Sequence, residues 1–351
     1  MEHLLEPSAE ELRARLAERG MPAYRATQVR RWLFQKRAGA IEAMTDVPQK
    51  ARGQLAAEFR IWTTEIARHR RGADGTEKLL LELGDAQQVE CVLLRDERQH
   101  ATACISTQVG CGMRCAFCAS GLGGLVRNLT RGEIVEQMLR LEQLLGPAER
   151  LSHVVVMGMG EPLANLDALL GALASATAPD ALGISARRVT VSTVGLPAPM
   201  RRLAEMDCQY HLAVSLHAAD DALRSRLVPA NRKVGIAAIL AAADEYFSRT
   251  GRRVTFEYVL LAGVNDGVED ARRLAGLLGG RPALVNLISY NPVPGLPFRR
   301  PAPAAVARFT EVLARGGLNV VVRHRKGERI NAACGQLRRG AGGAEGGRMK
   351  E

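Results

Sequence analysis

The sequence has no long hydrophobic run, and this absence excludes a membrane-spanning helix. No stretch approaches the roughly 18–20 consecutive apolar residues that a bilayer requires. The first residues, Met1 to Pro7, lack the basic start and apolar segment of a secretory signal. No internal repeat is visible. We therefore expect a cytoplasmic protein with no membrane association.

Acidic residues are fewer than basic residues, and this excess of positive charge indicates a polyanionic partner. Lys and Arg total 48 against 37 Asp and Glu, and the formal net charge is +11. Excess positive charge of this size is typical of nucleic-acid-binding proteins. An arginine-rich proteome with a merely basic surface explains the charge alone equally well.

Cysteine is scarce, and its placement excludes a disulfide framework. There are seven cysteines in a chain expected in a reducing compartment. Three stand within eight residues, as Cys111-Gly-Met-Arg-Cys115-Ala-Phe-Cys118. Thiolates this close converge on a metal or an iron–sulfur cluster. Three ligands leave one iron open to bind and activate another molecule. The alternative is a zinc site with a remote fourth ligand, namely Cys104, His217 or Cys334.

The residue pattern divides the chain into three parts. Residues 1–75 are expected to form a small, basic helical domain of RNA-binding type, with helices starting near Ser8, covering 25–37 and following Pro48. Residues 76–337 are expected to form an α/β domain. Residues 338–351 are a basic, Gly-rich tail that we expect to be disordered.

Within the α/β domain, β-rich segments alternate with amphipathic helices. Strands are expected at 89–95, 102–106, 153–157, 188–193, 211–215, 254–260, 284–290 and 318–323, and helices at 130–145, 235–249, 266–278 and 302–314. This order implies parallel strands covered by helices. About six repeats are visible, fewer than a closed barrel has, so we expect a partial (β/α)6 barrel. The cysteine triplet then lies at the carboxyl end of the strands, where active sites gather.

The cysteine spacing resembles that of the radical SAM superfamily. The resemblance implies a radical SAM barrel in which Cys111, Cys115 and Cys118 hold a [4Fe–4S] cluster and S-adenosylmethionine (SAM) binds the open iron. Further motifs resemble the RlmN/Cfr family of RNA methyltransferases, in the family's order from about residue 8 to 337. They are Tyr24-Arg-Ala-Thr-Gln-Val, Cys104-Ile-Ser-Thr-Gln-Val-Gly-Cys111, Arg127-Asn-Leu-Thr130, Gly158-Met-Gly-Glu-Pro-Leu163, Ser215-Leu-His217 and Ala332-Ala-Cys-Gly-Gln-Leu337.

The family resemblance implies methylation of adenine carbon 2 in 23S rRNA and in tRNA, with two SAM molecules per turnover and an external electron donor. Cys334 matches the S-methylcysteine intermediate that becomes crosslinked to RNA. Cys104 matches the thiol that resolves the crosslink through a transient disulfide. Glu90 matches the proton acceptor. Without the motifs, Cys104 and Cys334 would be interpreted as buried core thiols and Glu90 as an exposed strand residue. Cys91 and Cys208 match no motif, and we interpret both as core thiols.

The resemblance also implies a set of SAM contacts, all placed at carboxyl ends of expected strands. They are Gly160, Glu161, Ser192, Ser215, Leu216, His217 and Asn291. Arg329 and Asn331 stand where the family usually has acidic residues, and Val109 favours the carbon-2 branch. The alternatives are carbon-8 methylation of the Cfr kind, a non-catalytic metal-stabilised RNA-binding protein, and a radical SAM enzyme acting on a small molecule. We expect a monomer.

Overall fold

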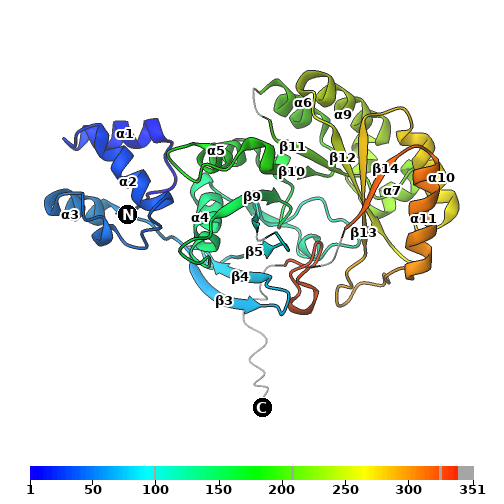
Figure 1. Ribbon diagram of the computed structural model, residues 1–351, viewed down its shortest axis with the longest axis horizontal. Coiled ribbons are helices and arrows are strands. Elements are labelled where there is room, and N and C mark those ends of the chain that lie inside the picture. Colours follow the sequence, from blue (N-terminus) through cyan, green and yellow to red (C-terminus); the bar gives the residue numbers. More distant parts are fainter. Residues whose placement is uncertain (99, 207–208, 324–325, 339–351) are drawn as a thin grey trace, which may run out of the picture.

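A computed structural model describes residues 1–98, 100–206, 209–323 and 326–338 (Figure 1). The expected tail beyond residue 338 and the core thiol expected at Cys208 lie outside the described residues. The helices are α1 Ala9–Glu18, α2 Tyr24–Phe34, α3 Gln49–Glu58, α4 Arg131–Glu142, α5 Leu166–Thr177, α6 Pro197–Glu205, α7 Asp221–Leu227, α8 Asn231–Val234, α9 Ile236–Thr250, α10 Val268–Leu278 and α11 Pro303–Arg315. The strands are β1 Glu2–His3, β2 Phe59–Arg60, β3 Glu65–Arg71, β4 Glu77–Glu82, β5 Gln88–Arg95, β6 Ala101–Cys104, β7 Gln108–Gly110, β8 Leu125–Asn128, β9 Leu151–Val156, β10 Val189–Thr193, β11 His211–Ser215, β12 Val254–Leu260, β13 Ala283–Ser289 and β14 Asn319–Val322.

One sheet of ten strands organises the larger domain, in the order β14-β13-β12-β11-β10-β9-β6-β5-β4-β3. All neighbours from β6 to β14 are parallel. Strands β5, β4 and β3 extend the sheet in antiparallel pairs. Helices α4, α5, α6, α7–α9, α10 and α11 make the six connections between successive parallel strands. The sheet has two open edges, β3 and β14, so the predicted partial barrel is confirmed.

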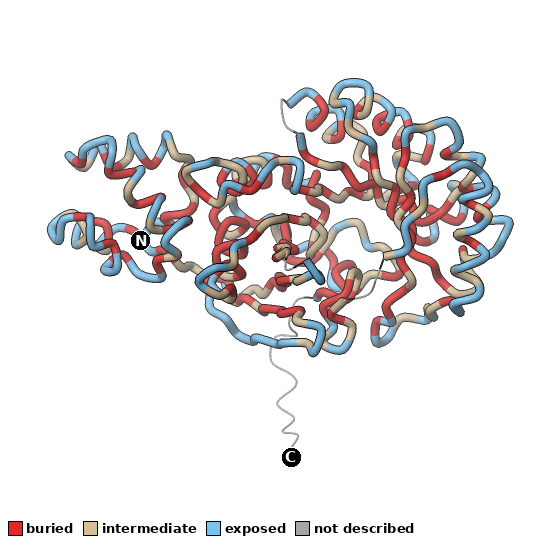
Figure 2. Tube along the Cα trace, viewed as in Figure 1, coloured by how far each residue is buried: buried red, intermediate tan, exposed pale blue. Residues whose placement is uncertain are grey.

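The helices cover the outer face of the curved sheet because both faces of its central strands are apolar. In β11, Leu212, Ala213 and Val214 are all buried. Figure 2 shows buried chain following the strands and exposed chain following the outer faces of the helices. Parallel strands covered in this way bury both faces. The polar ends of the strands are therefore the main part of the sheet left to form a site.

The N-terminal helices lie beside the barrel and share its core (Figure 1). Ser8 caps α1 through a capping box with Glu11, as its sequence predicts. The buried Arg30 of α2 donates to both carboxylate oxygens of Asp180, at 2.8 and 3.1 Å. Two of the basic residues of this domain, Arg30 and Arg37, therefore fasten it to the barrel.

Some strands were not expected. Residues 65–71, inside the range 1–75 expected to be helical, form β3, which pairs with β4 at the sheet edge. Every residue of β3 is exposed, so it lacks the alternation that reveals a half-buried strand. The hairpin of β7 and β8 was also not foreseen. Among the described residues, no helix has the length and apolar character needed to cross a bilayer.

Candidate active site

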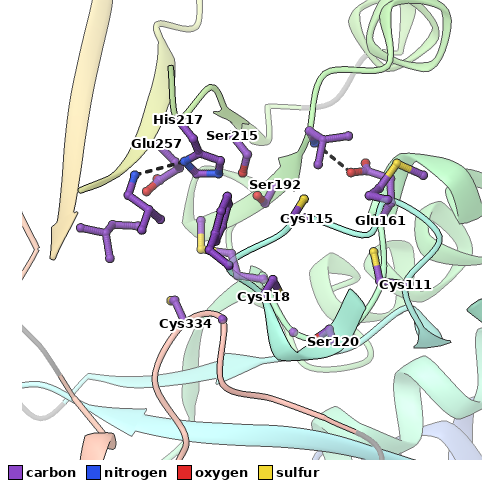
Figure 3. A pocket seen from close by; sticks show the side chains of 18 of the residues that line it. Cys111, Cys115, Cys118, Ser120, Glu161, Ser192, Ser215, His217, Glu257 and Cys334 are labelled. Carbon is purple, nitrogen blue, oxygen red and sulfur yellow. Dashed lines mark hydrogen bonds between the residues drawn. The ribbon is translucent and has the colours of Figure 1, made fainter. Parts of the chain in front are cut away.

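A cavity, the main cavity, opens at the carboxyl ends of the parallel strands (Figure 3). Ten residues singled out from the sequence line it: Cys111, Cys115, Cys118, Gly160, Glu161, Ser192, Ser215, His217, Asn291 and Cys334. They lie at the ends of six different strands or on the loops that follow them, and parallel topology brings such ends to one edge. The cavity has the position of a ligand site in a parallel α/β fold.

The three clustered cysteines lie on the loop between β7 and β8. Gly110 holds a φ of +77°, and a Cβ there would meet the carbonyl oxygen of Gly124 at 2.0 Å, so only glycine permits this tight hairpin. Figure 3 shows the sulfurs of Cys111 and Cys115 directed into the main cavity. Within the described part of the chain, no three His, Cys, Asp or Glu side chains converge closely enough to hold a single metal ion.

The electrostatic setting of these thiols fits cluster ligands. Burial raises the pKa of Cys111 to about 12 and also raises the pKa values of Cys115 and Cys118. Buried thiols of this kind stay protonated unless a cation replaces the proton. Iron binding would supply that cation.

Gly160 and Glu161 form the wall of the main cavity beside β9. A Cβ on Gly160, whose φ is +102°, would lie 2.6 Å from the Cβ of Gln108, so the turn requires glycine. The carboxylate of Glu161 accepts hydrogen bonds from the amides of Val194, at 2.8 Å, and Leu163, at 3.0 Å. It is only 2% exposed, and burial raises the pKa of Glu161 to about 7. A bound ammonium group would stabilise the ionised carboxylate and offset the unfavourable desolvation of its charge.

His217 is held as a neutral ring on the opposite wall. Its Nδ1 accepts a hydrogen bond from the amide of Val259 at 3.1 Å, which leaves the proton on Nε2. Burial lowers the pKa of His217 to about 3, so the ring does not ionise at neutral pH. Leu216 does not line the main cavity, and its amide donates to the carbonyl of Glu257.

Two charged residues at this site were missed by sequence reasoning. The fully buried guanidinium of Arg224 donates to the carbonyls of Val194, Ser215 and Leu216, and so ties the ends of β10 and β11 together. Glu257 lines the main cavity from β12, and burial raises its pKa. The sequence feature that could have identified both residues is a charged residue among apolar ones. Arg224 stands between Leu223 and Leu227, and Glu257 lies in the largely apolar strand Val254–Leu260.

A second cavity, the side cavity, lies on the other side of Cys334. Cys104, Cys334 and Arg323 line it, and Arg323 and Cys334 also line the main cavity. Both cysteines are free thiols. Burial raises the pKa of Cys104 to about 12, while the charge of Arg323 acts in the opposite direction. Cys334 therefore stands between the clustered cysteines and Cys104.

Asn291 and Glu90 complete the set of residues expected at the site. The amide of Asn291 donates to the carbonyl of Cys334 at 3.2 Å, while its Oδ1 is buried without a partner and awaits a donor. Glu90 lines neither cavity. It is buried on β5 and forms an ion pair with Lys78 at 2.7 Å.

The fold and the three-cysteine loop define a radical SAM protein. The family model of the Radical SAM superfamily matches residues 105–275. Residues 3–61 match the model of a second family, the ribosomal RNA large subunit methyltransferase N-terminal domain. A crystal structure of a radical SAM methyltransferase from Sphaerobacter thermophilus superposes with a TM-score of 0.94 at 43% identity, covering 96% of this chain and 99% of that one.

Curated relatives are similar over nearly the whole chain. A probable dual-specificity RNA methyltransferase RlmN of Rhodopirellula baltica is 57% identical over 97% of this chain and 91% of its own length. The dual-specificity RNA methyltransferase RlmN of Anaeromyxobacter dehalogenans is 48% identical over 93% and 89%. The chain belongs to the RlmN family of radical SAM RNA methyltransferases.

Proposed function

We propose that this protein methylates carbon 2 of adenine in 23S rRNA and in tRNA by passing the methyl group through Cys334. Its relatives are named dual-specificity RNA methyltransferases. The observation that carries the proposal is the placement of Cys334, which lines the main cavity with the clustered cysteines and the side cavity with Cys104. One sulfur can therefore face the methyl donor, and a second thiol lies beside it to end the reaction.

The residues of the main cavity fit a [4Fe–4S] cluster and SAM. Cys111, Cys115 and Cys118 would hold the cluster, and Glu161 would bind the amino group of SAM. The unpartnered Oδ1 of Asn291 and the hydroxyls of Ser192 and Ser215 supply further polar contacts. When bound, these groups supply the one-electron chemistry that an aromatic carbon without a lone pair requires.

The chain's own sulfurs perform the transfer. Cys334 accepts a methyl group, and that methyl group would lose one hydrogen atom to the adenosyl radical that bound SAM supplies. Its carbon would then join carbon 2 of the base, which would lose its C2 proton and return one electron to the bound cluster. The thiolate of Cys104 attacks the sulfur of Cys334, so that an S–S bond forms as the S–C bond breaks. The electron pair of the broken bond and a proton go to the carbon, which becomes the new methyl group. An external thiol must reduce the disulfide before the next turnover.

RNA must present its target base outside the stack, and the basic surface suits the phosphates beside it. Arg31 and Lys36 of the N-terminal domain are exposed, as is Arg329 near Cys334. Phosphate contacts of this kind give affinity without reading sequence. We place the protein in the cytoplasm, as a monomer served by an external electron donor, because its RNA substrates and its reduced thiols belong there.

The test is the variant Cys104→Ala expressed in cells with native RNA. Without the resolving thiol, the protein should accumulate covalently bound to RNA through Cys334. Ribonuclease digestion and peptide mass analysis would locate the added nucleotide. Cys91→Ala is the matched control, because Cys91 is a buried thiol that lines neither cavity. Absence of an adduct with Cys104→Ala would eliminate the two-sulfur route. Nucleoside mass analysis of the wild-type product would separate carbon-2 from carbon-8 methylation.

A further inference from the structure

A lysine and a glutamate form a buried ion pair in the antiparallel extension of the sheet, outside both cavities. Lys78 of β4 and Glu90 of β5 form an ion pair of 2.7 Å, and each side chain is 8% exposed. Withdrawing two charges from water is unfavourable unless further hydrogen bonds satisfy their remaining donors and acceptors. The partners that supply those bonds show what the pair does.

The remaining bonds of the pair go to both ends of the segment that carries Cys334. The Nζ of Lys78 donates to the carbonyl of Asn331 at 2.8 Å. The amide of Arg338 donates to the Oε2 of Glu90 at 2.9 Å. The pair thus fastens the segment 331–338 at its first and last residues, with Cys334 between them.

The middle of this segment is attached to the site itself. The amide of Ala119, next to a clustered cysteine, donates to the carbonyl of Gly335 at 2.8 Å. Asn331 adopts a φ of +52°, a left-handed conformation that Asn tolerates better than most residues, so the chain turns at the point that Lys78 holds. The position of the Cys334 sulfur therefore depends on anchors at both ends.

Both oxygens of Glu90 are occupied while the segment is in place, one by Lys78 and one by the Arg338 amide. A carboxylate in that state is not free to accept a proton from a substrate. Burial lowers the pKa of Lys78, and the charges of Arg70 and Arg338 act in the same direction, opposed by Glu90. The lysine charge is thus maintained largely by Glu90.

We propose that Lys78 is a positioning residue that, paired with Glu90, holds the segment 331–338 so that Cys334 stays between the two cavities. The role of Cys334 in this statement rests on the proposed function. The anchoring itself is a property of the folded chain and is measurable without RNA.

The experiment measures alkylation of Cys334 by iodoacetamide in the anaerobic, cluster-loaded full chain, with peptide mass analysis at timed points. In Lys78→Met the rate at Cys334 should rise about tenfold or more, the scale set by losing one charge-assisted hydrogen bond. The fully buried Cys91 is the internal control, because general loosening of the fold would expose it as well. Lys78→Arg should restore the wild-type rate, and Lys233→Met, at an exposed lysine of α8, should not change it.

An unchanged Cys334 rate in Lys78→Met would overturn the proposal. A parallel rise at Cys91 would also overturn it, because Lys78 would then only stabilise the fold. A selective rise at Cys334 that Lys78→Arg reverses would establish the anchoring. In the background of Cys104→Ala, Lys78→Met should then lower the yield of the RNA adduct. If no variant forms an adduct while the alkylation result holds, the proposed function fails and the anchoring stands.

Discussion

Replacing Glu161 by glutamine is expected to stabilise the free protein and to weaken its binding of SAM. The carboxylate is buried, and its partners are the amides of Val194 and Leu163 and the side chain of Thr193, none of which is a cation. Burial raises the pKa of Glu161 from 4.5 to about 7. The site therefore carries a buried acid that is favourable for the protein only when a cationic ligand is present.

The size and sign of the effect follow from proton linkage. The unfolded chain ionises this carboxyl above pH 4.5, whereas the folded chain resists ionisation until about pH 7. Stability associated with Glu161 is therefore complete below pH 4.5 and is lost as the pH rises to about 7. The difference of about 2.5 pH units, at 1.36 kcal/mol per unit, amounts to about 3 kcal/mol at pH 8. At pH 5.5 the same reasoning gives about 1 kcal/mol.

Urea unfolding of the cluster-free protein at pH 5.5 and pH 8 measures this difference. Glu161→Gln should gain up to about 3 kcal/mol over wild type at pH 8, less the loss of one accepted hydrogen bond, and clearly less at pH 5.5. Glu18→Gln, at an exposed residue of α1, is the control and should change stability by no more than about 0.5 kcal/mol.

Binding of SAM to the reconstituted protein should show the opposite trend. Wild-type affinity should weaken towards tenfold for each pH unit below 7, because protonated Glu161 offers no charge to the amino group. Glu161→Gln should bind at least tenfold more weakly at pH 8 and lack this acid dependence. Equal or lower stability of Glu161→Gln at pH 8, together with unchanged SAM affinity, would refute the reasoning.

Three further predictions concern the chain's own groups. Arg323→Met removes the charge shared by both cavities, so resolution by Cys104 should slow about tenfold and RNA adduct should accumulate in time courses on gels; a wild-type rate would contradict this role. His217→Asn should fold nearly as well as wild type, because Asn tolerates the φ of +60° and can accept from the Val259 amide, whereas His217→Val should lose about 1–3 kcal/mol in urea unfolding. RNA affinity measured between low and moderate salt should fall steeply on a log–log plot, and a flat response would exclude phosphate contacts as the main source of affinity.

The sequence predicts the parts of the fold that depend on short-range signals. The capping boxes at Ser8 and Thr130 begin α1 and α4, as the spacing of Ser or Thr and Glu indicates. The parallel strands match their β-rich segments closely. Strand β3 was missed because all its residues are exposed, and the hairpin of β7 and β8 because its strands have only 3 and 4 residues.

The residues of the site also divide into those that local sequence signals predict and those that they do not. Glu161 and Ser215 are recognisable because they follow strands within motifs, and parallel topology carries them to one edge. Arg224 and Lys78 were missed because their main partners are backbone carbonyls and a carboxylate of other segments, which no local pattern reveals. The ion pair of Lys78 and Glu90 also explains why a residue matched to proton transfer lies outside both cavities in this conformation.

The central claim is that the methyl group passes through Cys334 and loses a hydrogen on the way. The most direct measurement supplies SAM with a trideuterated methyl group and determines the mass of the methyladenosine formed over several turnovers. Transfer through Cys334 predicts a product methyl group with two deuteriums and one hydrogen, because one deuterium is abstracted and a proton returns from solvent. A product that retains all three deuteriums would contradict the account.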